Sequence, residues 1–212
     1  MRMALAAVLL AAGVSLALAQ GHGRLFPPED LGALEGPDRD AWQKPEQVMD
    51  ALGIADGARV ADLGAGGGYF TIRLARRVGP NGIVYAEDVQ DEMLGSIERR
   101  IEREQLTNVK TVKGTFDNPR LPSGELDAVL IVDTFNAFER PITVLQRVRE
   151  ALKTGGRVGI IEYTKEGHGP GPDMEDRIDP DAVIRAGRAA GLRLAKRETF
   201  LRYQYMLVFE KP

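Results

Sequence analysis

Apolar residues recur along this chain with two different spacings. Short apolar runs, such as those within 58–64 and 126–133, are typical of strands that are buried on both faces. Other stretches, such as 90–104, carry apolar residues every three or four positions with charged residues between them, as amphipathic helices do. From residue 45 onward the two patterns alternate. This order predicts a parallel sheet with helices on both of its faces.

Glycine and proline set the limits of the predicted elements. The strands are expected at 58–64, 83–89, 108–114, 126–133, 157–163, 192–200 and 203–211. The helices are expected at 45–52, 69–79, 90–104, 141–152 and 179–191, and residues 164–178 are expected to form a Gly/Pro-rich loop. Almost no residues separate the last two strands, so they are expected to pair as a hairpin. That hairpin would place one antiparallel strand at an edge of the sheet.

The first 19 residues differ in character from the rest of the chain. One cation, Arg2, precedes an apolar run, and Ala17 and Ala19 stand three and one positions before a cleavage point at Gln20. This layout predicts a signal peptide, residues 1–19, and an exported protein, periplasmic or secreted, with no stable membrane association after cleavage. An uncleaved membrane anchor is the alternative. If the run is not a leader at all, a cytoplasmic protein is expected.

Residues 20–44 are polar and contain glycine and proline, with one aromatic landmark, Trp42. We expect an irregular N-terminal segment with a short helical piece, and this segment is a possible lid over a ligand. The alternative is that Trp42 merely anchors a loose segment. Residues 45–212 are predicted to form one domain, since a chain of this length can bury a core of ordinary size.

The charge balance argues against nucleic acid as a partner. Lysine and arginine together number 28 and the acids 31, for a net charge of −3, so there is no basic surplus. Cysteine is absent, which excludes a disulfide scaffold, a zinc-thiolate site and a cysteine nucleophile. No metal site is expected.

The stretch VADLGAGGGYF, residues 60–70, places four glycines within five residues directly after an apolar run. A phosphate-binding P-loop needs Lys-Ser or Lys-Thr after its glycines, and neither follows here. A dinucleotide-binding loop needs a third glycine where this chain has Tyr69. A tight turn without a ligand is expected to use one or two glycines rather than four. A ligand that requires bare backbone but brings no pyrophosphate fits best.

Two acids end neighbouring predicted strands. Asp62 ends the first strand, where its carboxylate would suit a cationic amino group. Asp88 ends the second strand, where an acid is placed to accept both hydroxyls of a ribose. In open parallel sheets the ligand lies beyond the carboxyl ends of the strands, near the first strand. The predicted ligand therefore has a ribose and a nearby cation.

These features resemble the class I S-adenosylmethionine-dependent methyltransferases, over residues 45–210. The motifs that carry the resemblance are VADLGAGGGYF and VYAEDVQDEML. It implies an α/β fold with a doubly wound, seven-stranded Rossmann-like sheet whose last strand is antiparallel, and S-adenosyl-L-methionine as cofactor. If the N-terminal segment is a lid, we expect Trp42 to lie across the cofactor and Arg39 to lie near its methionyl carboxylate. The implied cofactor-binding residues are Asp62, Gly64, Ala65, Gly66, Asp88, Val89, Thr115, Phe116 and Asp133, with Glu87 as a less favoured alternative to Asp88.

The stretch DTFN, residues 133–136, stands where the fourth motif of that family reaches the reacting methyl group. The Asn/Asp-Pro-Pro-Tyr/Phe run of enzymes that methylate amino groups of nucleic acid bases is absent, and the pattern is nearer to quinone-type C-methyltransferases. The resemblance thus implies methyl transfer to a small molecule. The alternative is an exported adenosyl-ligand binding or interaction protein that keeps the fold without turnover. The catalytic residue is unknown, and the candidates are Asp133, Asn136, Glu162, Tyr163 and His168.

Overall fold

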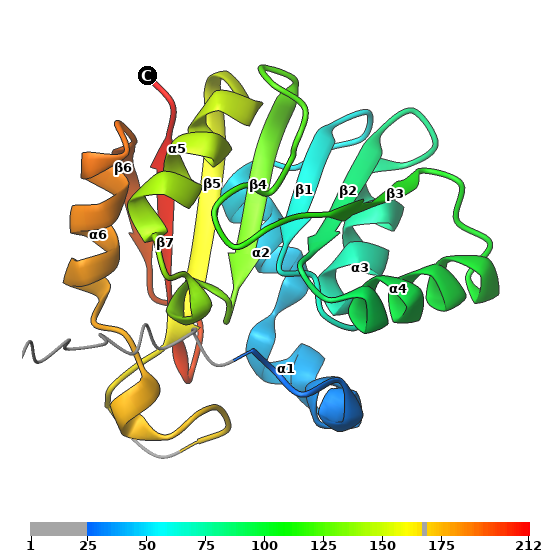
Figure 1. Ribbon diagram of the computed structural model, residues 1–212, viewed down its shortest axis with the longest axis horizontal. Coiled ribbons are helices and arrows are strands. Elements are labelled where there is room, and N and C mark those ends of the chain that lie inside the picture. Colours follow the sequence, from blue (N-terminus) through cyan, green and yellow to red (C-terminus); the bar gives the residue numbers. More distant parts are fainter. Residues whose placement is uncertain (1–24, 167–168) are drawn as a thin grey trace, which may run out of the picture.

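A seven-stranded sheet in the order β3-β2-β1-β4-β5-β7-β6 forms the centre of the molecule (Figure 1). The computed structural model describes residues 25–166 and 169–212, so the predicted signal peptide and His168 lie outside the described residues. The strands are β1 Arg59–Leu63, β2 Ile83–Asp88, β3 Val109–Lys113, β4 Leu126–Val132, β5 Leu152–Tyr163, β6 Arg193–Glu198 and β7 Gln204–Glu210. The predicted doubly wound sheet is confirmed, because β3, β2, β1, β4 and β5 pair in parallel.

Helices cover both faces of the sheet, as the alternating pattern predicts. One face carries α2 Pro45–Leu52, α3 Tyr69–Val78 and α4 Asp91–Arg103. The other carries α5 Pro141–Ala151 and α6 Pro180–Ala189, which stand in front of the sheet in Figure 1. Two short helical pieces, η1 Pro28–Glu35 and α1 Arg39–Gln43, precede α2, and two more, η2 Phe135–Ala137 and η3 Met174–Asp176, lie in later connections.

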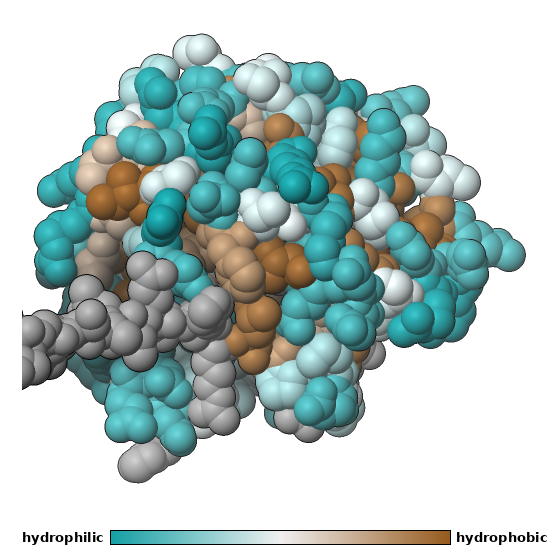
Figure 2. All heavy atoms as spheres, viewed as in Figure 1, coloured by the Kyte–Doolittle hydropathy of each residue, from teal (hydrophilic) through white to brown (hydrophobic). Residues whose placement is uncertain are grey.

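Two apolar cores hold the layers together, one on each side of the sheet. Alternate strand residues point to opposite faces, so Ala61 and Leu63 join the core under α5 and α6 while Val60 joins the core under α2 and α3. The outer surface of the face with α5 and α6 is mostly hydrophilic, and apolar side chains show between the elements (Figure 2). This is the arrangement that the helix periodicity predicts.

The antiparallel strand is present, but its expected place at the sheet edge is wrong. The strand β7 inserts between β5 and β6 and runs antiparallel to both, so β6 is the edge strand. Burial explains the order. Five residues of β7 are buried, whereas β6, with the sequence RLAKRE, exposes most of its residues and carries charges suited to an edge.

The strand β5 also begins earlier than the sequence predicts, at Leu152 rather than Arg157. The prediction that TGG stops the preceding helix is wrong, because α5 ends at Ala151 and the TGG residues, 154–156, lie inside β5. Gly155 adopts a positive φ of 76°, and the pairing of β5 with β4 shifts register between Leu126 and Ala128. The two glycines therefore carry an irregularity inside a long strand.

The topology brings the carboxyl ends of β1, β2, β4 and β5 to one edge of the sheet. Because β7 runs the other way, its first residue, Gln204, lies at that same edge and pairs in register with Tyr163, the last residue of β5. Within the described residues, no helix is both long enough and apolar enough to cross a membrane.

Candidate functional site

The loop between β1 and α3 turns through three glycines in the left-handed region. Gly64, Gly66 and Gly68 have φ values of 71°, 54° and 82°, which side chains with a Cβ rarely adopt. A Cβ on Gly64 would also come within 2.2 Å of the Thr134 side chain. The expectation that the turn alone needs only one or two glycines is therefore wrong. The backbone path itself accounts for three of the four.

Two acids at the end of β2 hold this loop in place. The Asp88 carboxylate accepts hydrogen bonds from the backbone N–H of Gly66 (3.0 Å) and of Gln90 (2.9 Å). The Glu87 carboxylate accepts from the N–H of Gly64 (3.3 Å) on the opposite face of the strand. A Cβ on Gly114 would lie within 1.7 Å of Glu87, so this glycine leaves the space that the Glu87 side chain fills. The acids thus shape the loop as well as facing the predicted ligand edge.

Carboxylates gather at this edge and are almost completely buried. Burial raises the pKa of Asp62 to about 6, although a hydrogen bond from the Thr71 hydroxyl (2.7 Å) opposes the shift. Burial and the charge of Asp88 raise the pKa of Glu87 to about 8. Burial likewise raises the pKa of Asp88 above its ordinary value. Such a set would be stabilised by a ligand that brings a cation and hydroxyl donors, which is the chemistry of an adenosyl sulfonium with an amino group.

A second pair of acids lies where β4 and β5 end. Asp133 has a positive φ of 51°, and both of its carboxylate oxygens accept from the Gln204 side-chain amide (2.8 and 2.9 Å). Glu162 accepts from the backbone N–H of Phe135 (2.7 Å) and so holds the DTFN turn against β5. Burial raises the pKa of both carboxyl groups, and the charge of Asp133 raises that of Glu162 further.

The N-terminal segment, residues 39–44, lies over this edge. The Arg39 guanidinium sits 3.8 Å from the centre of the Tyr69 ring, and Asp40 accepts a hydrogen bond from the Tyr69 hydroxyl. The Trp42 ring lies 6.3 Å from that of Tyr163 and 6.0 Å from that of Tyr203. The segment is therefore fixed against α3 and against two aromatic residues, Tyr163 at the end of β5 and Tyr203 before β7. Its role as a lid stays a prediction.

Arg177 organises the loop between β5 and α6. It is 8% exposed and donates hydrogen bonds to the backbone carbonyls of Thr164 (2.8 Å) and Pro172 (3.0 Å). Its guanidinium lies 5.4 Å from the centre of the Tyr163 ring. A Cβ on Gly171 would come within 2.7 Å of the same ring, so the loop packs closely on Tyr163.

The structure brings most of the predicted site residues to one edge, but not all of them. Thr115 is exposed, and its hydroxyl bonds within its own turn to the carbonyl of Asn118 (3.2 Å). Phe116 is 41% exposed, Val89 is half-buried after Asp88, and Asn136 lies in η2. The proposed adenine contacts therefore stay predictions.

Sequence reasoning missed the two glutamines at this edge, Gln43 and Gln204. They are 0% and 2% exposed. The available signal was a polar residue opening an otherwise apolar strand, in YQYMLVF, since a buried amide needs partners.

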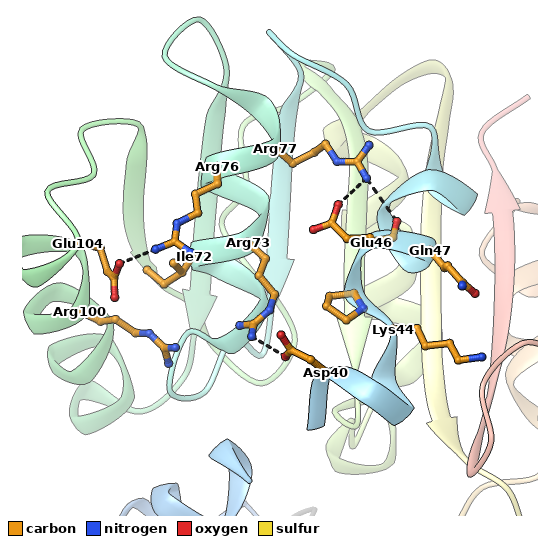
Figure 3. Close-up of a pocket in the computed structure, with 11 residues that line it drawn as sticks. Asp40, Lys44, Glu46, Gln47, Ile72, Arg73, Arg76, Arg77, Arg100 and Glu104 are labelled. Atoms are coloured by element: carbon orange, nitrogen blue, oxygen red, sulfur yellow. Dashed lines mark hydrogen bonds and ion pairs between the residues drawn. The ribbon is translucent and has the colours of Figure 1, made fainter. Parts of the chain in front are cut away.

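A groove of about 680 Å³ lies outside this edge, between α1, α2, α3 and α4 (Figure 3). Its arginines pair with acids: Arg73 with Asp40, and Arg76 with Glu104. Arg100 donates to the carbonyl of Gly67 (3.4 Å), which ties the groove to the back of the glycine loop. Exposed ion pairs of this kind contribute about 0–1 kcal/mol each. We therefore interpret the groove as a solvated surface of arginine–acid ion pairs that is separate from the carboxylate edge.

Comparisons with known proteins agree with this geometry. A family described as a methyltransferase domain matches residues 60–156, from β1 into β5. The demethylmenaquinone methyltransferase of Geobacillus sp. WCH70 is 32% identical over 120 residues, which cover 57% of this chain and 51% of that protein. The chain thus spans about half the length of this curated relative.

Solved structures extend the similarity over nearly the whole chain. A SAM-dependent methyltransferase from Aquifex aeolicus is 27% identical with a TM-score of 0.84, and the match covers 88% of this chain and all of that one. A phosphoethanolamine N-methyltransferase from Haemonchus contortus, solved with S-adenosyl-L-methionine, shares the fold at 15% identity and a TM-score of 0.66, over 81% of this chain and 53% of that one. These findings confirm the predicted fold and support S-adenosyl-L-methionine as the cofactor, while its placement at the glycine loop stays a prediction.

Proposed function

We propose that this chain, whose sequence and fold are those of a class I S-adenosylmethionine-dependent methyltransferase, transfers a methyl group to a small organic acceptor. The observation that carries the proposal is the glycine loop between Asp62 and Asp88, which lies inside the matched methyltransferase region. No lysine that would bind a phosphate follows the loop glycines. The buried carboxylates suit a cationic nucleoside instead.

The residues at the edge have separate tasks in this proposal. When bound, the cofactor supplies a methyl group that its sulfonium charge already activates. Asp88 would accept hydrogen bonds from the ribose hydroxyls, while Asp62 and Asp133 would attract the cationic part of the ligand. Positioning alone contributes much of the acceleration of such a displacement, since well-held reactants gain about 7–11 kcal/mol. Trp42 and Tyr163, packed over the same edge, would limit the entry of water.

The acceptor is proposed to be a small ring compound of the quinol type. The relative from Geobacillus supports this class by its printed activity, and the aromatic side chains of Trp42, Tyr163 and Tyr203 provide surfaces for a flat ring. Nucleic acid is disfavoured, because the chain has a net charge of −3 and no basic surplus.

An acceptor screen tests the proposal. Purified protein is mixed with S-adenosyl-L-methionine and a panel of reduced demethylmenaquinone analogues, phenols and amines, and release of S-adenosylhomocysteine is measured. Release is expected with a ring acceptor and not with the amines. If the protein binds the cofactor tightly but releases no S-adenosylhomocysteine with any acceptor in the panel, turnover is contradicted and a binding protein that keeps the fold is favoured.

We further propose that the chain is exported and cleaved after Ala19. The apolar run that follows Arg2 and the small residues at positions 17 and 19 support this. Mass spectrometry of the protein purified from its natural source is expected to find Gln20 at the N-terminus, outside the cytoplasm. An intact Met1 in the cytoplasmic fraction would contradict export.

A further inference from the structure

A buried line of hydrogen bonds joins the N-terminal segment to the end of β4. The Arg39 Nε donates to the Gln43 Oε1 (2.6 Å), and the Gln43 Nε2 donates to the Gln204 Oε1 (2.9 Å). The Gln204 Nε2 then donates to both oxygens of Asp133 (2.8 and 2.9 Å). Residues far apart in the sequence thus form one connected chain from α1 through β7 to β4.

The charged ends of this line fix the orientation of both amides. Arginine can only donate, and an ionised aspartate can only accept. Gln43 must therefore turn its oxygen toward Arg39, and Gln204 must turn its nitrogen toward Asp133. Every N–H in the line points toward the Asp133 carboxylate. In agreement, the positive charge of Arg39 and the hydrogen bonds from Gln204 both oppose the rise in the Asp133 pKa that burial causes.

Burial makes each hydrogen bond in this line costly to break. Gln43 and Gln204 are 0% and 2% exposed, so an amide that loses its partner cannot turn to water. Leaving a buried polar group unsatisfied costs about 1–3 kcal/mol. Docking of α1 therefore stabilises the observed orientation of the Asp133 carboxylate, and that orientation in turn stabilises docking of α1.

The backbone of Asp133 is held independently of its side chain. Its N–H donates to the carbonyl of Ile161 (2.9 Å), so the turn after β4 stays attached to β5. The direction of the carboxylate is then set by what the side chain bonds to, which is Gln204. Trp42 of the N-terminal segment packs beside Gln204, against Tyr163 and Tyr203, but two polar contacts of the segment lie away from this point. Lys44 donates to the carbonyl of Phe200 (2.9 Å), and Asp40 pairs with Arg73 on α3.

We propose that Gln43 and Gln204 are positioning residues that couple docking of the N-terminal segment, residues 39–44, to the orientation of the Asp133 carboxylate at the ligand edge. The inference rests on the proposed function for its ligand. It adds that the segment acts on the site through a specific line of amides and that neither glutamine needs to touch the ligand.

Calorimetry with S-adenosylhomocysteine tests the coupling. Gln43→Met has nearly the same size and helix preference but cannot bond Gln204, and Gln43→Glu keeps the acceptor for Arg39 but offers no N–H. Each is expected to weaken binding about tenfold, which corresponds to the loss of about 1.4 kcal/mol. In an Asp133→Asn background the same changes should cost less than about twofold, because the charged end of the line is already gone. Gln47→Met, on the exposed side of α2, is the matched control and should leave affinity unchanged.

Hydrogen exchange without any ligand separates the coupling from the proposed function. Coupling is reciprocal, so Asp133→Asn should loosen α1. The amide of Lys44, which bonds the carbonyl of Asp40 (3.1 Å), is expected to exchange about fivefold faster in Asp133→Asn, the effect of replacing a charge-assisted bond by a neutral one. Unchanged exchange, or equal losses of affinity in both backgrounds, would overturn the coupling. If the wild type binds no S-adenosylhomocysteine but Asp133→Asn still speeds the exchange of the Lys44 amide, the proposed function is overturned and the coupling is kept.

Discussion

At the scale of single residues, buried acids define this molecule. Asp62, Glu87, Asp88 and Glu162 are each less than 10% exposed, and burial raises the pKa of every one of them. The sequence predicted Asp62 and Asp88 from their places at strand ends. It did not predict the environment of Glu87, because the space for this side chain comes from Gly114, on the neighbouring strand connection. Contacts between distant segments carry no local sequence signal.

Glu87→Gln is expected to change the pH dependence of stability. Burial and the charge of Asp88 raise the Glu87 pKa from 4.5 to about 8, so the folded protein holds this proton more tightly than the unfolded chain does. Folding stability contributed by this group is therefore present at low pH and lost as pH rises between about 4.5 and 8, at about 1.4 kcal/mol per pKa unit.

Urea unfolding of both proteins across this pH range checks the expectation. The variant should match the wild type near pH 4, exceed it increasingly up to about pH 8 and keep a constant advantage above that, since glutamine does not titrate. A difference between the two proteins that stays constant with pH would contradict a titrating, buried Glu87.

At the scale of elements, close packing decides where glycine is needed inside helices. Gly187 lies in α6, where a Cβ would come within 2.5 Å of the Phe209 ring of β7. Gly95 lies in α4, where the nearest atom to a Cβ is the flexible end of Arg99 at 3.4 Å. The sequence predicts both helices, yet it cannot tell these glycines apart, because the difference lies in what the sheet presents to each helix.

The same substitution at the two helix positions should have opposite effects. Gly187→Ala is expected to destabilise the fold by about 1–3 kcal/mol through overpacking against Phe209. Gly95→Ala should stabilise it by up to about 1 kcal/mol, because alanine favours the helix. Midpoints of urea unfolding compare the two variants directly. A stabilising Gly187→Ala would show that α6 packs less closely on β7 than the structure has it.

At the scale of the whole molecule, the order of the strands creates the site. Periodicity predicted the parallel strands, and with them an edge where Asp62, Asp88 and Asp133 meet. It did not predict that β7 lies between β5 and β6 rather than at the edge. That insertion brings Gln204 to the carboxyl edge beside Asp133, and it lets α1 bond into the site. The hairpin was visible in the sequence, whereas its placement depends on which strand buries more apolar surface.

Calorimetric titration of S-adenosyl-L-methionine into the wild-type protein and Asp88→Ala measures directly whether this edge binds the cofactor. The wild type is expected to bind, and Asp88→Ala to bind about 10- to 100-fold more weakly, because hydrogen bonds to a charged carboxylate contribute about 1.5–3 kcal/mol. Gln47→Met, on the exposed side of α2, is the control and should retain binding, and unfolding midpoints show whether each variant folds. No binding by the folded wild type, or equal affinity in Asp88→Ala, would contradict the assignment of this edge to S-adenosyl-L-methionine.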